Sequence, residues 1–312
     1  MKNNLEIEVI PKTTYCQMIE NKNIPLWATQ FAIEAYGTSV ILGVKHNNII
    51  ISTFVAPVYY DSKNIAAIKR NYRFLPYMMP LYWCDVSSLQ KKQIVRKIFE
   101  YLFKNYMYTY IPLHPLFTEC AAIASLGGFV EMRQTHILKN QPIYPNSVKQ
   151  KAKSAQKKVN VKICNRIDEF DFDKAIKGTS EETFLRRHFA SRIFESGNAK
   201  AFIGTDKEFV HGGIFLVFDN QWCYLLHSWK DPESVKGIIP LLITEAVSYV
   251  FSNKLASVFD FEGSVIDSID DFFASFNSET ITYPYIHYAK NTEELYGLIS
   301  RSINIPGRII QD

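Results

Sequence analysis

The sequence predicts a mixed α/β protein built from two similar domains in tandem. Three observations support this fold class: a length of 312 residues, a strand hairpin in each half, and the same order of helices and strands after each hairpin. At about 150 residues per domain, that length suggests two domains. Hairpins followed by a strand–helix–strand crossover are typical of helices packed on a mixed, largely antiparallel sheet.

The first half begins with an edge strand and a helix, then forms a hairpin that turns at His46–Asn48. Its longest helix is amphipathic, with Ile94, Ile98 and Leu102 on one face. Gly127 and Gly128 fit the C-cap of a later helix. The predicted elements are strand 5–10, helix 29–36, strands 39–45 and 49–58, helix 89–106, strand 108–111, helix 116–126 and strand 129–138.

The second half repeats this order, with a hairpin turn at Asp206–Glu208 and an N-cap pair formed by Ser264 and Asp267. Two prolines in Gln141–Asn146 prevent a helix from continuing, so we place the joint there, between domains 1–145 and 146–312. The predicted elements are strand 159–163, helix 181–195, strands 201–205, 209–218 and 222–229, helix 238–251, strand 257–261, helix 265–276 and strand 281–288.

The composition is that of an ordinary globular protein. A balance of 35 Lys and Arg against 31 Asp and Glu gives a net charge of +4, which excludes a uniformly basic surface. The N-terminus has no secretory pattern, and the most apolar stretch, 237–251, is shorter than the roughly 18–20 residues of a membrane span. Five scattered cysteines indicate reduced thiols, so we expect a cytoplasmic protein without integral membrane association or a metal cofactor.

One motif in the second half carries a family resemblance. Phe259–Ser264 reads FDFEGS and is followed by Asp271–Phe273, Ser275-Phe276 and Tyr283; Arg133–Thr135 precedes a lysine-rich helix. With these residues the chain resembles bacterial tandem GNAT-fold acyltransferases related to the Fem-type peptidoglycan aminoacyltransferases. The resemblance covers nearly the whole chain. It implies two GNAT-like domains and acyl transfer to an amine, with acyl-CoA or aminoacyl-tRNA as co-substrate.

Glu262 and His227 are the candidate catalytic residues. Strand alternation places Asp260 and Glu262 on one face, where the Glu262 carboxylate would accept a proton or hold the acceptor amine. Alternatively, Glu262 bonds backbone amides at the Gly263 turn. His227 shares a face with Trp229 and would relay a proton, or it is a structural histidine.

Lys236, Gly237 and Ile238 stand where a helix N-terminus would bind the phosphates of a donor. A full pyrophosphate loop would contain several glycines with Gln or Arg, and this loop contains one glycine before Pro240. The alternative is that Gly237 is only a turn residue.

Two further groups are candidates for substrate binding. Lys149, Lys153 and Lys157 recur every four residues and form a positive helix face, suited to tRNA or a phosphorylated acceptor, or merely solvated. In the first half, Arg73 and Tyr77 belong to a stretch that interleaves cations with rings, which grips a nucleotide or sugar or packs as a strand. Tyr283, which belongs to the resemblance, is expected to join them.

Three functions remain open from the sequence. The first is an N-acyltransferase that moves an acyl group from acyl-CoA to an amine-bearing small molecule, with the second domain catalytic. The second is an aminoacyl-tRNA-dependent transferase acting on a cell-wall precursor or peptide. The third is a degenerate GNAT pair that binds a ligand without catalysis.

Overall fold

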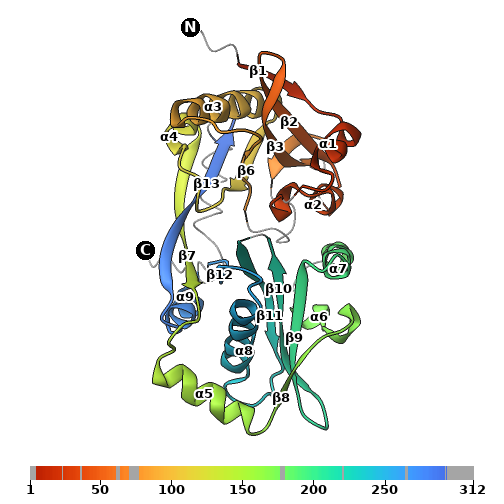
Figure 1. The fold of residues 1–312 in the computed structure, drawn as a ribbon, viewed down its shortest axis with the longest axis vertical. Helices are drawn as coiled ribbons and strands as arrows, with labels where there is room; N and C mark the ends of the chain where they lie inside the picture. The colour runs from red at the N-terminus through yellow and green to blue at the C-terminus, as the bar shows by residue number, and fades with distance from the viewer. Residues whose placement is uncertain are drawn as a thin grey trace. The chain divides into compact units, whose positions relative to one another are not determined.

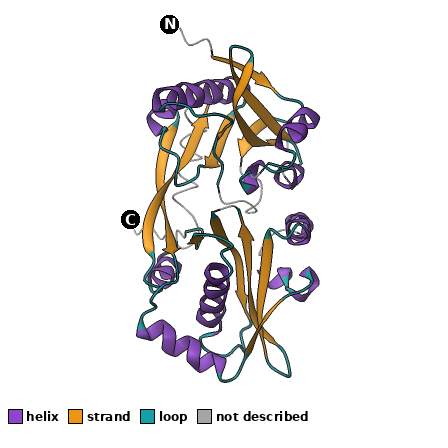
Figure 2. Cartoon of the chain, viewed as in Figure 1, coloured by secondary structure: helices purple, strands orange, loops and turns teal. Residues whose placement is uncertain are grey.

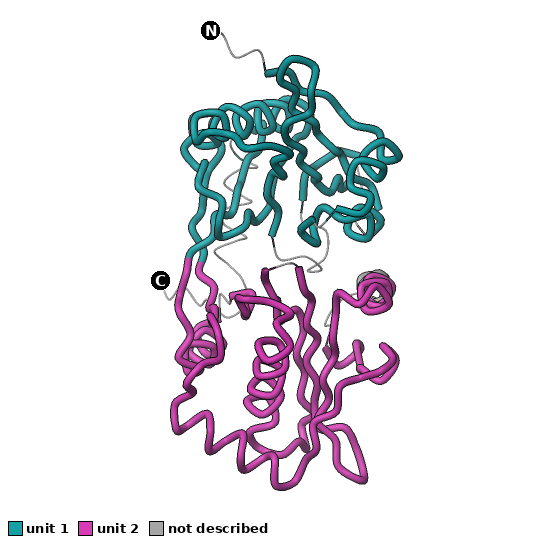
Figure 3. Tube along the Cα trace, viewed as in Figure 1, with its two compact units in different colours: residues 1–133, 282–312 teal, residues 134–281 magenta. Residues whose placement is uncertain are grey.

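The computed structural model describes residues 5–22, 24–35, 37–60, 64–69, 77–175, 180–219, 221–263, 266–291 and 293. It has the mixed α/β architecture expected from the sequence, with strands flanked by helices (Figures 1 and 2). The chain forms two compact units, one of residues 1–133 and 282–312 and the other of residues 134–281 (Figure 3). No helix in the described part of the chain is long and apolar enough to cross a membrane.

The sheet of unit 1 has the order β1-β2-β3-β4-β6-β13. Strands β1, β2 and β3 pair antiparallel, and β4 runs parallel to β6. The helix α3 begins with a capping box formed by Ser87 and Gln90 and buries the predicted face of Ile94, Ile98 and Leu102. The elements are β1 (Leu5–Val9), α1 (Lys12–Ile19), the short 3-10 helix η1 (Leu26–Ala28), α2 (Gln30–Ala35), β2 (Ser39–His46), β3 (Ile49–Tyr60), β4 (Ala66–Lys69), β5 (Leu81–Tyr82), α3 (Ser88–Asn105), β6 (Tyr108–Pro112), α4 (Cys120–Ala124) and β7 (Phe129–Lys139).

The sheet of unit 2 has the order β7-β12-β11-β10-β9-β8. The helix α8 packs on β9, β10 and β11 and is itself covered by α5 (Figure 1). Its buried residues Leu242, Ala246 and Val250 form the core with Phe202 and Leu216. The elements are α5 (Asn146–Gln156), β8 (Asn160–Ile163), η2 (Ile167–Glu169), α6 (Phe172–Ala175), α7 (Ser180–Glu195), β9 (Ala199–Thr205), β10 (Val210–Phe218), β11 (Trp222–Lys230), α8 (Ile238–Ser252), β12 (Val258–Asp260), α9 (Asp267–Ala274) and β13 (Glu279–Ala289).

The two halves of the sequence exchange their last strands. Tyr285–Ala289 of β13 pairs with β6 in unit 1, and Ile137–Lys139 of β7 pairs with β12 in unit 2. The units therefore divide within β7 and β13, while 141–146, the predicted joint of the duplicated segments, lies in unit 2. The exchange leaves no trace in the sequence, because a strand pattern does not show which neighbour the strand pairs with.

Two predicted helix caps have different outcomes. Gly127 has a left-handed backbone (φ +85°) at the end of α4, and the Gly128 N–H donates to the Ile123 carbonyl, as a Schellman-type end requires. Asn277, with φ +60°, has the corresponding left-handed conformation after α9. The predicted N-cap pair of Ser264 and Asp267 at α9 is wrong for Asp267. The N-cap is Ile266, and Asp267 is the first residue of the helix. Ser264 lies outside the described residues.

Candidate functional site

Strands β11 and β12 part at the FDFEGS motif. They pair in parallel over only three positions, Trp222–Tyr224 against Val258–Asp260, and β11 then continues to Lys230. On its other side β11 has a bulge: Leu225 pairs with Leu216 and His227 with Phe215, so Leu226 is the extra residue. Beyond Tyr224 the described β12 no longer pairs with β11.

A strained turn follows β12. Glu262 and Gly263 both have φ +64°, a left-handed conformation that costs a glutamate strain. The Asp260 carboxylate, fully buried, accepts the Glu262 N–H at 2.7 Å and the Thr135 hydroxyl at 2.5 Å. Strand alternation is therefore the wrong basis for placing Glu262, because the strand ends at Asp260 and the left-handed backbone turns the chain.

The neighbouring strand β7 fixes this turn through its backbone. The Phe261 N–H donates to the His136 carbonyl at 2.9 Å. A Cβ on Gly263 would lie 2.3 Å from the Gln134 carbonyl oxygen, so only glycine allows this close approach. Glu262 is half-buried at the turn that these contacts hold. At this turn the Asp260 carboxylate accepts a hydrogen bond from the backbone N–H of Glu262. The role of the Glu262 side chain in proton transfer stays a prediction.

His136 is a residue that the sequence analysis missed. Its ring is 2% exposed, with Nε2 donating to Asp270 Oδ1 at 2.8 Å and Nδ1 lying 3.0 Å from Ser278 Oγ. These bonds tie α9 and the start of β13 to β7. No local pattern marks such a residue, since its partners are more than 130 positions away in the sequence.

His227 lies on the face of the sheet that α6 covers. Its ring centroid is 6.3 Å from that of Phe172 and 6.4 Å from that of Phe215. Trp229 belongs to the same aromatic group through Phe170, at 6.5 Å, as alternation along the strand predicts. These ring contacts are those of a packed histidine, and the catalytic role of His227 stays a prediction.

The loop before α8 is built around Gly237. This residue is the N-cap, with φ +90°, and a Cβ there would lie 2.4 Å from the Lys151 carbonyl of α5. The glycine therefore permits the close packing of α5 on the helix start, which supports its reading as a turn residue. Lys236 is exposed and Ile238 is buried, and phosphate binding by Lys236–Ile238 stays a prediction.

The predicted basic face of α5 is formed as expected. Lys149, Lys153 and Lys157 are exposed at the helix and its C-cap, while Val148, Ala152 and Ala155 are buried. The face is solvent-accessible, and its ligand is untested.

The remaining candidates lie in unit 1, apart from the unit that holds Glu262 and His227. Tyr77 and Tyr283 are brought together with ring centroids 4.9 Å apart, although 205 residues separate them in the sequence. Both are buried, and Tyr77 also meets the ring of His114 edge-on at 5.6 Å. Arg73 lies outside the described residues. Substrate binding by these residues stays a prediction.

Comparison with solved structures defines the class of fold. No protein-family model matches the sequence, and no curated protein does. A tandem GNAT protein from the clavulanic acid biosynthesis pathway superposes with a TM-score of 0.54 at 9% identity, covering 92% of this chain and 99% of that one. L-PGS from Bacillus licheniformis gives a TM-score of 0.57 at 7% identity, covering 92% and 94%. The chain thus has a tandem GNAT fold, as its sequence predicts.

The likeness extends to a Fem protein. FemX superposes with a TM-score of 0.64 at 12% identity, covering 94% of this chain and 99% of FemX. The arrangement is therefore a Fem-like tandem GNAT fold over almost its entire length. Among the described residues no group of three or more His, Cys, Asp or Glu is placed to hold a metal ion.

Proposed function

We propose that the protein is an N-acyltransferase whose transfer site is the parting of β11 and β12 in unit 2. The observation that carries this proposal is the strained turn at Glu262 and Gly263, directly where β12 stops pairing. Backbone strain of this kind is retained where the surrounding structure holds a functional group in place. The solved structures that resemble this chain in fold include a tandem GNAT protein and FemX, and this likeness supports acyl-transfer chemistry.

In the reaction the amine attacks the thioester carbon, a C–N bond forms, and the C–S bond breaks so that the CoA thiolate leaves and takes up a proton. This requires a donor for the developing oxyanion and an acceptor for the amine proton. We assign the oxyanion to the edge of β11 beyond Tyr224, along which the described β12 does not pair with it. Glu262 is suited to the proton, being half-buried on a turn that β7 holds. His227 on β11 is the second candidate for proton transfer.

The donor is tested by calorimetry with acetyl-CoA and longer acyl-CoA thioesters. We expect measurable binding of at least one thioester and turnover with an amine acceptor. Glu262→Gln should lower kcat at least about 100-fold with little change in donor binding. Glu208→Gln, an exposed glutamate in the same unit, is the matched control and should leave kcat unchanged. Unchanged turnover in the Glu262 variant would exclude this residue as the base.

A second candidate is an aminoacyl-tRNA-dependent transferase that modifies a cell-wall precursor or peptide. Two observations favour it: the exposed lysine face of α5, and the Lys151 carbonyl packed against the start of α8, where a donor pyrophosphate would otherwise bind. Charged tRNA should then bind with an affinity that falls steeply with salt, because each phosphate contact releases counterions.

The lysine face provides the test of this alternative. Changing Lys149, Lys153 and Lys157 to glutamine should reduce the slope of log affinity against log salt by about 2–3. The matched control changes three exposed lysines of α3: Lys92, Lys97 and Lys104. An equal effect of both triple changes would indicate nonspecific attraction. A chain that binds neither thioesters nor tRNA would contradict both transferase candidates and leave the non-catalytic binding module as the remaining hypothesis.

A further inference from the structure

A concave site lies in unit 2 at the C-terminal end of α8. It is a hollow of about 600 Å³, within the range of small-molecule sites. Glu262, His227 and the lysine face are absent from its lining, so it is distinct from the proposed transfer site and independent of that proposal. Its lining residues are Asn140, Gln141, Ser248, Phe251, Ser252, Lys254, Ala256 and Ser257.

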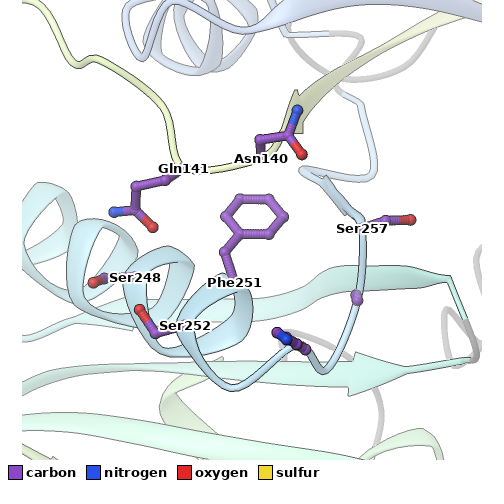
Figure 4. A pocket seen from close by; sticks show the side chains of 8 residues that line it. Asn140, Gln141, Ser248, Phe251, Ser252 and Ser257 are labelled. Atoms are coloured by element: carbon purple, nitrogen blue, oxygen red, sulfur yellow. The ribbon is translucent and has the colours of Figure 1, made fainter.

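The lining combines one aromatic ring with many neutral polar groups. Figure 4 shows the Phe251 ring standing in the hollow with the carboxamides of Asn140 and Gln141 above it. The hydroxyls of Ser248 and Ser252 lie beside the ring, one helical turn apart on the same face of α8. Within the described part of the chain these two hydroxyls bond no other side chain or carbonyl, so they are available to a ligand.

The helix end beside the hollow satisfies its own backbone. The Lys254 N–H donates to the Phe251 carbonyl and the Leu255 N–H to the Val250 carbonyl, with Lys254 in the left-handed conformation at φ +54°. The Asn253 side chain donates to the Tyr249 carbonyl at 2.8 Å. The Ser257 hydroxyl donates to the Gln221 carbonyl at 3.2 Å, so Ser248 and Ser252 are the lining serines that remain for recognition.

The near-neutral lining of the hollow favours an uncharged ligand. Of the described residues only Lys254 contributes a charge, and no carboxylate is present. The C-terminal end of a helix carries partial negative charge, which disfavours an anion and favours hydroxyl donors. A ligand that offers several hydroxyls around one apolar face matches the hydroxyls of Ser248 and Ser252, two carboxamides and a phenyl ring.

We propose that this hollow binds a pyranose ring of a carbohydrate, with the apolar C–H face of the sugar on Phe251 and its hydroxyls on Ser248, Ser252 and the two carboxamides. The carboxamides both donate and accept, which suits hydroxyl groups that do the same. The site requires no conformational change, because the hollow is present in the free chain.

The test is saturation-transfer NMR on the full chain with methyl β-D-glucopyranoside and N-acetylglucosamine as probes. Saturation should reach the ring C–H protons of at least one sugar. Phe251→Ala should weaken binding about tenfold, and Ser252→Ala about threefold. The matched controls are Phe129→Ala and Ser154→Ala, which remove the same groups outside the hollow and should leave binding unchanged.

Phe251 also packs against the core of unit 2, so its loss affects folding as well as the hollow. Ser252→Ala and Gln141→Ala change exposed side chains only and keep the test valid if the Phe251 variant unfolds. Absence of saturation for both sugars, or binding unaltered in the Ser252 and Gln141 variants, would overturn the proposal. Binding of uridine in place of either sugar, lost on the same changes, would also overturn it and assign the hollow to a nucleobase.

Discussion

Gly263→Ala directly tests how the strained turn at the proposed transfer site is held. The glycine has φ +64°, and a Cβ at this position would meet the Gln134 carbonyl oxygen at 2.3 Å, well inside ordinary contact distance. A backbone oxygen of a paired strand cannot move away as a flexible side chain would. The methyl group must therefore displace either β7 or the turn that carries Glu262.

The cost has two parts that a control variant separates. Left-handed backbone in alanine costs about 1–2 kcal/mol relative to glycine. Overlap with a fixed neighbour adds about 1–3 kcal/mol. Gly197 has φ +81° with no atom within 4 Å of its Cβ position, so Gly197→Ala incurs only the first part. We expect Gly263→Ala to be the more destabilising of the two by about 1–3 kcal/mol.

Urea unfolding of both variants measures this difference, and turnover is the second readout. A shift of the turn by about 1 Å should lower kcat at least about 100-fold if the turn positions a catalytic group. Equal free energies of unfolding for the two variants would refute the close approach to Gln134. Full turnover in Gly263→Ala would refute the role of the turn in catalysis.

Three further changes test the electrostatics of unit 2. Burial raises the pKa of Asp219 to about 6, so its contribution to stability is present below about pH 4 and lost as pH rises through 6. The unfolding free energy of the wild type relative to Asp219→Asn should accordingly fall by up to about 3 kcal/mol between pH 4 and 7 in urea titrations. For Asp206 the dependence of stability on pH has the opposite sign, because hydrogen bonds from the Phe209 and Glu208 amides and from His211 lower its pKa to about 2. The unfolding free energy of the wild type relative to Asp206→Asn should therefore rise as pH increases from about 2 to 4. Thr135→Val removes a donor from the buried Asp260 and should cost about 1–3 kcal/mol at neutral pH, whereas a cost near zero would show that Asp260 does not depend on it.

The sequence predicted the parts of the fold that depend on local periodicity. The buried face of α3, the hairpins and the glycine end of α4 follow from side-chain spacing and backbone preference, and the structure has them. Strand alternation placed Glu262 on one face of the sheet with Asp260, and this reasoning was wrong at Glu262. Alternation does not predict a glutamate with a left-handed backbone. His136 could not be found at all, because its role depends on Asp270 and Ser278, which only the tertiary fold brings near.

Because the two halves exchange their last strands, we expect that segment 1–145 does not fold on its own. Segment 1–145 lacks β13, whose Tyr285–Ala289 covers the edge of β6, buries Ile286 and stacks Tyr288 on Phe103 at 3.8 Å. It also lacks His287, which lies 2.8 Å from Glu131 Oε2 and is fully buried.

Burial of Ile286 alone contributes about 1.5–3 kcal/mol to the free energy of unfolding, a large share of the stability of a small domain. We therefore expect segment 1–145 to aggregate or to unfold without cooperativity. A version that carries residues 279–291 on a flexible linker should regain a cooperative urea transition, and the same linker with Ile286→Asp should not. A cooperative, monomeric transition in segment 1–145 by itself would instead show that the contiguous half is the folding unit, because β6 would then be stable without the strand that pairs with it here.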